Sequence, residues 1–436
     1  MSNDSTKPNL VRAIGRWTLV ALVVNSIIGS GIFGLPGDIA KFLGPAAPWA
    51  YLIAALGIGI IMAVHAELAS QFSDAGGPYL YAREAFGRFC GIQMGWFGWL
   101  VRVTSAAANA NLFVIYFGEF WRGATSPLPR AILLALLIGA LAAANFRGVR
   151  AGARISNLLT TAKLIPLGAL IVAGLIFVHR PASIAAAADP SLASWSNAIM
   201  ALIFAFGGFE MALIPMAEAK NPRRDAPFAL FTGLAVVTAV YALIQVIAMW
   251  SVPDLAGRTR PLADAARVII GPAGAGLIAI GAMLSTYGHL SAQLVATPRL
   301  TYAMAKNGDL PRALAAVHPR FRTPHLSIVL WAVIVLGLAI YGSFIWNAIL
   351  SAAGRLLTYS IGCAALIRLR RLRPTADAFR LPAGPLFAVL GMVFCVAMIF
   401  RMNAARAQII LTLTGLAAVN WLVVRRRAQR ETRPGV

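Results

Sequence analysis

Long apolar stretches recur along this chain from residue 18 to residue 424. About 20 consecutive apolar residues in a helix cross the hydrocarbon core of a bilayer. Of the 436 residues, 59% are hydrophobic and only 12% are charged. A soluble domain typically has about 25% charged residues. We therefore predict an all-α polytopic membrane protein.

Twelve of these stretches are candidate membrane spans. From the N-terminus they cover Thr18–Phe42, Ala47–Ser70, Cys90–Phe117, Pro129–Asn145, Ile155–Val178, Trp195–Ala217, Pro227–Trp250, Gly274–Thr301, Pro324–Tyr341, Phe344–Ile367, Pro385–Met402 and Ala405–Val424. Most of the 38 Lys and Arg residues fall in alternate connections, on the side that includes both ends of the chain. Basic residues gather in cytoplasmic loops, so both termini are predicted to be cytoplasmic, which requires an even number of spans.

The net charge of +23 is explained by this topology and does not indicate nucleic-acid binding. The three cysteines lie in or beside apolar stretches and form neither a disulfide framework nor a metal-ligand pattern. The sequence has no HExxH motif, no phosphate-binding loop with lysine and no Ser/His/Asp set at membrane depth. We therefore expect neither an enzyme nor direct drive by ATP, and we predict no metal ion and no cofactor.

The first apolar stretch contains the segment Asn25–Pro36, NSIIGSGIFGLP, with three glycines and a closing proline. Glycines make a helix easy to unwind, and a proline removes one backbone donor. Unwound backbone inside a membrane is buried in protein or lines a watery cavity, where its N–H and C=O groups can hold a polar ligand. The alternative is an unbroken packing helix, because glycine-rich faces let helices approach closely.

The sixth stretch contains a second segment of this kind, Phe204–Pro215, FAFGGFEMALIP, with Gly207, Gly208 and the charged residue Glu210. Two glycine- and proline-interrupted helices at corresponding positions of two halves indicate the binding site of a transporter. We therefore predict that both helices are broken and that the two breaks together form a binding site.

Four charged side chains fall clearly within predicted spans: Arg102, Lys163, Glu210 and Arg355. Charges at membrane depth are costly and usually face the interior of the bundle. Lys163 either snorkels to the surface or is a buried amine, whose desolvation favours the neutral form and lets it cycle protons. Glu210 either braces the unwound segment through backbone N–H groups, acts in gating or proton transfer, or contacts the substrate. Arg102 and Arg355 are expected to be structural, and His289 is expected to be a satisfied interior histidine rather than a proton carrier.

Several motifs, in order, resemble those of the amino acid–polyamine–organocation permeases. They are GSGIFGLP in the first span, AELAS and AGGPYLYAREAFG around and after the end of the second, and AFGGFE and EAKNPRRDAP around the sixth. The resemblance covers residues 16–373 and implies a five-plus-five inverted repeat of the LeuT kind, with helices 1 and 6 broken. The repeats would cover residues 18–178 and 195–367, followed by two helices over 385–424. The cytoplasmic N-terminus would cover 1–17 and a basic cytoplasmic tail 425–436.

A half-helix N-terminus carries partial positive charge, so we expect the substrate carboxylate there and the substrate ammonium on nearby carbonyls. The resemblance places Lys163 where relatives hold a sodium ion, beside the first break and the eighth span, and gives Phe204 the position of an aromatic lid. The expected substrate-binding residues are Ile27, Gly29, Ser30, Gly31, Phe204, Ala205, Phe206 and Gly207, and the expected coupling or gating residues are Lys163, Glu210, Ser285 and Thr286.

These features predict a secondary active transporter of amino acids in the plasma (inner) membrane that works by alternating access and is coupled to protons. A neutral substrate is favoured over a cationic one, because Arg102, Lys163 and Arg355 outnumber Glu210 at membrane depth. A sodium-independent exchanger of amino acids or amines is the alternative within transport, and a membrane sensor or channel is the alternative outside it. The expected partners are the small-molecule substrate, protons and the lipid bilayer.

Overall fold

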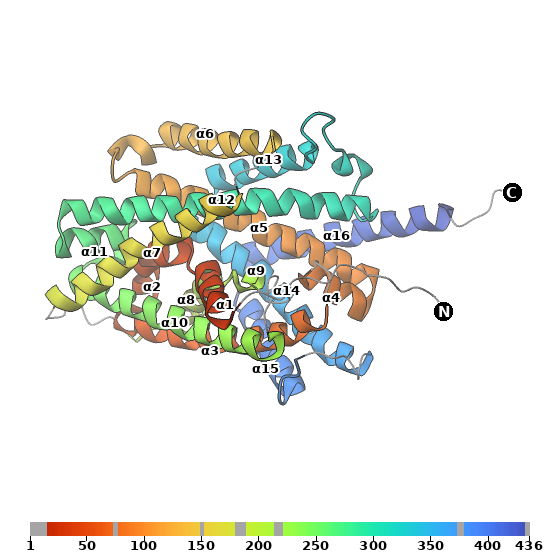
Figure 1. Ribbon diagram of the computed structural model, residues 1–436, viewed down its shortest axis with the longest axis horizontal. Helices are drawn as coiled ribbons and strands as arrows, with labels where there is room; N and C mark the ends of the chain where they lie inside the picture. The colour runs from red at the N-terminus through yellow and green to blue at the C-terminus, as the bar shows by residue number, and fades with distance from the viewer. Residues whose placement is uncertain are drawn as a thin grey trace.

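The computed structural model describes residues 15–72, 77–148, 152–178, 189–212, 221–372 and 379–431. Throughout these ranges the regular structure is helical (Figure 1). In the first half the helices are α1 (Arg16–Ile27), α2 (Ser30–Leu43), α3 (Ala47–Ser70), α4 (Gly77–Phe86), α5 (Arg88–Phe117), α6 (Pro127–Phe146) and α7 (Gly152–Phe177). In the second half they are α8 (Leu192–Phe206), α9 (Phe209–Ala212), α10 (Pro222–Ser251), α11 (Pro261–Ile269), α12 (Pro272–Lys306), α13 (His325–Tyr341), α14 (Phe344–Leu372), α15 (Gly384–Phe400) and α16 (Ala404–Glu431). Short 3-10 helices lie between several of them.

Eight helical stretches within the described ranges are long and apolar enough to cross a membrane, and four shorter apolar helices accompany them. One of the eight, Ser30–Ser70, contains both α2 and α3, which are joined through a 3-10 helix at Gly44–Ala46. The chain is therefore a polytopic all-helical membrane protein, as its composition predicts. The number of spans, twelve, remains a prediction.

The helices pack around three apolar cores. The largest joins α1, α2, α3, α8, α10 and α14, and it surrounds the two glycine-rich segments. A second core joins α5 and α12 to α6 and α13, which lie side by side at one edge of the molecule (Figure 1). A third core joins α3 and α14 to α15. This arrangement places the glycine-rich segments inside the bundle rather than against lipid.

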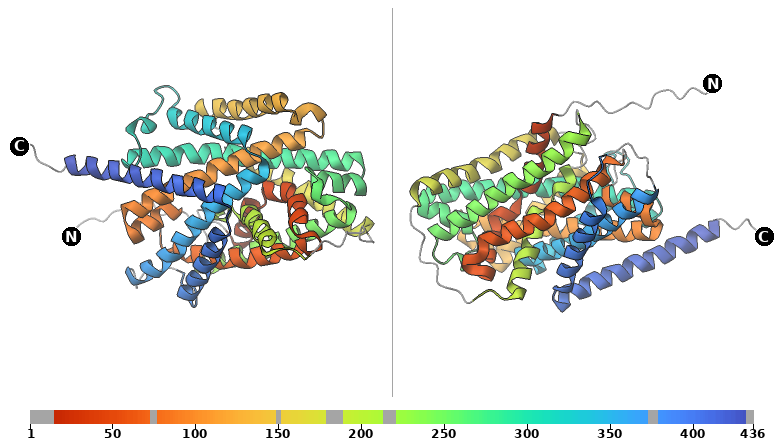
Figure 2. Two further views of the ribbon diagram at one scale, coloured as in Figure 1. Left: turned by 180° about the vertical axis from the view of Figure 1, so that it is seen from behind. Right: turned by 90° about the horizontal axis from the view of Figure 1, so that it is seen from below.

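Several helices extend beyond the predicted spans. α12 continues to Lys306, and α16 continues to Glu431 and so includes the start of the predicted basic tail. Figure 2 shows α16 projecting past the rest of the bundle. The end of the second glycine-rich segment, residues 213–215, lies outside the described residues.

Candidate functional site

The first predicted break is present, and it is short. α1 ends at Ile27, and α2 begins at Ser30, so that only Ile28 and Gly29 are non-helical. The first turn of any helix leaves backbone N–H groups without partners inside that helix. The break therefore presents the start of α2 to the interior of the bundle.

The other two glycines of this segment serve close packing instead of unwinding. Both lie inside α2. A Cβ atom on Gly31 would lie 2.7 Å from the Cα of Ala205 in α8, and one on Gly34 would overlap the ring of Phe344 in α14. The helix is therefore broken rather than continuous, but only Gly29 lies in the break, and Gly31 and Gly34 allow close packing.

The second break follows α8, at Gly207 and Gly208. Gly208 has a φ of 117°, which side-chain-bearing residues rarely adopt. Its Cα faces the carbonyl oxygen of Ser26, which a Cβ atom would overlap. The two breaks are thus in contact, and this contact needs a residue without a side chain.

Tyr241 of α10 contacts both breaks, and sequence reasoning missed it. Its hydroxyl donates to the carbonyl oxygens of Ile27 (3.1 Å) and Ala205 (3.4 Å). Its ring packs 5.4 Å from that of Phe206. A hydroxyl in the middle of an apolar span is the signal that could have identified it, because polar groups at membrane depth are usually functional.

Lys163 of α7 also contacts the first break. Its Nζ donates hydrogen bonds to the carbonyl oxygens of Asn25 (2.8 Å) and Ile28 (2.5 Å). The residue is 9% exposed, so the amine points inward instead of snorkelling to the surface. A single amine therefore joins α7 to the end of α1 and to the unwound residue beside it.

The two expected partners of Lys163 on α12 lie close to α7 but are not bonded to the amine. Pro166 of α7 packs against Gly281 of α12, one helical turn from Ser285 and Thr286. Thr286 donates to the Ala282 carbonyl of its own helix, and the buried Ser285 hydroxyl has no hydrogen-bond partner among the described residues.

Glu210 of α9 lies at the centre of a polar network behind the second break. One of its oxygens accepts from Arg355 Nη1 of α14 at 2.8 Å and from the Tyr359 hydroxyl, and the other accepts from the backbone N–H of Gly208 at 2.7 Å. The guanidinium of Arg355 fills the space where a Gly207 side chain would lie. The carboxylate thus braces the unwound segment and also ties it to α14.

His65 of α3 adjoins this network and was also missed. It is fully buried, and its ring packs edge-on against Phe209 and Tyr359, with centroids 6.0 and 5.5 Å away. Its Nδ1 is 2.9 Å from the Ile61 carbonyl oxygen, and its Nε2 has no partner among the described residues. A histidine inside an apolar helix was the available signal.

The remaining predicted residues lie around the same region. Phe204 is buried and meets Phe344 edge-on, with ring centroids 6.1 Å apart. Arg102 of α5 donates to the Gly98 carbonyl of its own helix at 2.9 Å. His289 of α12 is 3.2 Å from the Ser105 hydroxyl of α5.

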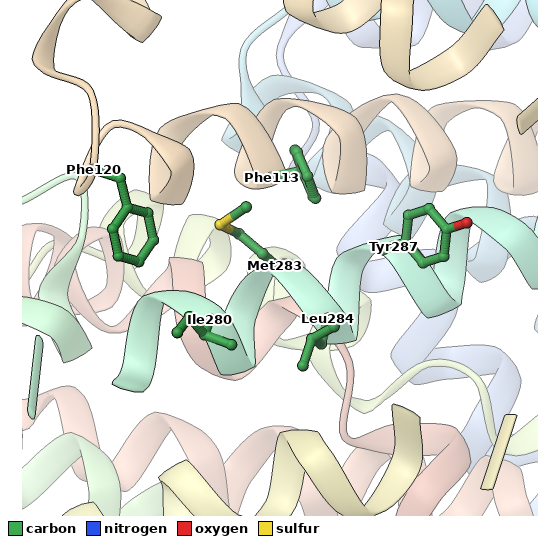
Figure 3. A pocket seen from close by; sticks show the side chains of 6 residues that line it. All are labelled: Phe113, Phe120, Ile280, Met283, Leu284 and Tyr287. Atoms are coloured by element: carbon green, nitrogen blue, oxygen red, sulfur yellow. The ribbon is translucent and has the colours of Figure 1, made fainter. Parts of the chain in front are cut away.

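An apolar hollow between the end of α5 and α12 is a separate feature (Figure 3). It is lined by Phe113, Phe120, Ile280, Met283, Leu284 and Tyr287. Ile280 and Tyr287 are exposed on the outer face of α12. The hollow lacks the polar groups that would recognise an amino acid, so the broken helices are the better candidate site.

Two helices broken within apolar stretches, with their ends in contact and an ion pair behind them, are the arrangement expected of a transporter's binding site. Comparison with protein families agrees, because the amino acid permease family model matches residues 14–419. The chain belongs to this family, an amino acid permease family of the amino acid–polyamine–organocation superfamily.

Three relatives from Bacillus subtilis (strain 168) are similar over most of the chain. A methylthioribose transporter is 26% identical over 97% of this chain and 94% of the relative. The serine/threonine exchanger SteT is 32% identical over 73% of this chain and 74% of the relative. The branched-chain amino acid permease BcaP is 26% identical over 92% of this chain and 90% of the relative.

Proposed function

We propose that the protein is a secondary active transporter of amino acids that works by alternating access and is coupled to protons. The substrate carboxylate binds the N–H groups of Gly29, Ser30 and Gly31, at the positive end of α2. The substrate ammonium binds carbonyls near Ile27 and along Phe204–Phe206. The surplus of interior basic residues disfavours a substrate with a cationic side chain.

One observation carries the coupling proposal: the Lys163 amine donates to the carbonyls of Asn25 and Ile28. A charged amine there attracts two carbonyl dipoles and ties α7 to the first break. Losing the proton removes about half of that attraction, because hydrogen bonds to charged groups are roughly twice as strong as neutral ones. A change in protonation can therefore bias the transporter toward one facing state.

The arrangement in the membrane completes the proposal. We propose twelve spans in a plasma membrane, with both termini cytoplasmic and with residues 18–178 and 195–367 forming an inverted repeat. The broken helices α1–α2 and α8–α9 would then be the first of each repeat, as expected for a site at the interface of two repeats.

Uptake into liposomes tests this function. Purified protein is reconstituted, and uptake of labelled amino acids is followed with and without an imposed pH gradient. Saturable uptake that exceeds equilibrium only with an inward proton gradient is the expected result. Uptake that ignores the pH gradient would contradict proton coupling, and binding without any uptake would indicate a sensor.

A second candidate function is sodium-independent exchange of one amino acid for another. The similarity to a relative named as a serine/threonine exchanger favours it. Liposomes preloaded with unlabelled amino acid distinguish the two. Exchange requires internal substrate but does not require a pH gradient. Proton-driven transport, in contrast, accumulates substrate in liposomes that contain none at the start.

A further inference from the structure

Arg102 of α5 and Arg355 of α14 lie at the same level along these two packed helices. The Ser351 hydroxyl of α14 donates to the Val101 carbonyl of α5 at 3.0 Å. A Cβ on Gly354 would lie 2.8 Å from Val101 Cγ2. Arg102 follows Val101 and Arg355 follows Gly354, so the two arginines leave adjacent points of a tight helix contact.

Only one of these two positive charges is compensated. Arg355 pairs with Glu210, which is already occupied by the Tyr359 hydroxyl and the Gly208 N–H. Arg102 donates to the Gly98 carbonyl, a neutral group, and over the residues that the structure describes no carboxylate lies within ion-pair distance of it. A guanidinium has several further N–H donors and does not lose its proton in a protein.

Arg102 thus carries an uncompensated charge at membrane depth. An unpaired charge at membrane depth is costly unless it faces a partner, water or a ligand. Arg102 is only half-buried, although its neighbours Val101 and Val103 are buried. The Glu210 side chain, with which it interacts electrostatically, is 19% exposed. Neither side chain is therefore fully enclosed by the surrounding protein.

The level of Arg102 along the bundle is close to that of the first break. A Cβ on Gly34 would lie 3.0 Å from Leu112 Cδ1, which fixes the level of α2 against α5. Gly29 precedes Gly34 by about 7 Å of chain and Arg102 precedes Leu112 by about 15 Å, at 1.5 Å per residue. The two helices run in the same direction in the predicted topology, so Arg102 lies about 8 Å nearer to the cytoplasmic side than Gly29 does. An arginine side chain and a substrate side chain together bridge such a gap.

We propose that Arg102 binds a carboxylate on the side chain of the substrate, so that the site prefers acidic amino acids over their amides. This rests on the proposed function, because the α-carboxylate and ammonium groups are assigned to the breaks. The guanidinium fork suits a carboxylate, which accepts two parallel N–H bonds. Ser105, one turn after Arg102 in α5, is buried and contacts His289 of α12 at 3.2 Å, so polar groups extend from Arg102 toward the level of the break.

The test measures ligand affinity by the thermal stability of the purified full-length protein, since a ligand of the native state raises it. The probes are L-glutamate, L-aspartate, L-glutamine, L-asparagine and acetate. One charge-assisted pair corresponds to about 10- to 100-fold in affinity. The wild type is expected to bind the acids more tightly than the amides by that factor. Arg102→Gln is expected to remove the difference, and Arg102→Lys to restore part of it.

Arg401→Gln is the matched control, because Arg401 is exposed at the end of α15. It is expected to keep the wild-type ratio. Equal affinity of the wild type for acids and amides overturns the proposal even if Arg102→Gln does not fold, and so does an unchanged ratio in Arg102→Gln. If acetate stabilises the protein as much as glutamate does, and if this stabilisation depends on Arg102, the site binds free anions. That result also overturns the proposal. Failure to bind any amino acid overturns the proposed function as well.

Discussion

The Arg355 guanidinium contacts the Glu210 carboxylate at 2.8 Å and thereby joins α14 to the segment that follows the second break. The two residues are 145 positions apart in sequence. The Arg355 side chain is 5% exposed and that of Glu210 is 19% exposed, so the pair is shielded from most of the solvent. A change in the conformation of the second break must therefore stretch or carry along this ion pair.

We predict that Glu210→Gln impairs transport more than binding. Glutamine keeps the shape and accepts hydrogen bonds but leaves Arg355 without its charge partner, which costs about 1–3 kcal/mol in a pair that is not fully buried. The measurements are turnover in liposomes and ligand affinity in detergent. Asp254→Asn, at an exposed position after α10, is the control. Wild-type turnover in Glu210→Gln would remove Glu210 from any gating or proton role.

Lys163→Ala should abolish proton-driven accumulation while leaving substrate exchange measurable. Alanine also leaves the carbonyls of Asn25 and Ile28 without their donor, at about 1–3 kcal/mol for each buried acceptor. Lys163→Arg should keep the charge permanently, because a guanidinium does not deprotonate, and so slow net uptake. Uptake with and without a pH gradient is measured for the wild type, Lys163→Ala and Lys163→Arg. If Lys163→Ala still follows the gradient fully, another residue couples transport to protons.

Gly29→Val and Gly31→Val should both abolish substrate binding, for different reasons. At Gly29 a Cβ meets only the Ile27 carbonyl oxygen at 3.8 Å, so the fold accommodates it and the loss comes from blocked approach of the ligand. At Gly31 a Cβ lies 2.7 Å from Ala205 Cα, and the misfit should also cost about 1–3 kcal/mol in stability. Gly139→Val in α6, with nothing within 4 Å, is the control for both. Normal ligand affinity in either variant would place the site elsewhere.

Arg370→Gln should lower stability far more than Arg371→Gln. Glu67 of α3 is fully buried, and it accepts from Arg370 at 2.8 and 2.6 Å and from the backbone N–H of Leu381 at 2.8 Å. Removing Arg370 leaves that carboxylate without a countercharge, which costs about 3–5 kcal/mol. Arg371 is exposed. Thermal unfolding in detergent should show a lower midpoint for Arg370→Gln alone, and equal midpoints would contradict a stabilising role for this pair.

The sequence by itself determined the class of protein and marked the segments that form the candidate site. Apolar stretches long enough to cross a bilayer predict membrane-spanning helices. The glycine-rich segments near Gly29 and Gly208 mark the places where such a helix unwinds most easily. Charges at membrane depth are rare, so Lys163, Glu210, Arg102 and Arg355 stood out without any structure. These signals are local, because each depends on the composition of a single segment.

The tertiary structure decided what each of these residues contacts. Gly29 unwinds but Gly31 does not, because Gly31 is needed for contact with Ala205. Sequence could not show that Glu210 pairs with Arg355 rather than Arg102, since both arginines lie at one level of the α5–α14 contact. The sequence of Tyr241's span shows a hydroxyl among apolar residues, but only folding brings the carbonyls of Ile27 and Ala205 to that hydroxyl. Pairings between distant segments depend on helix packing, which local composition does not specify.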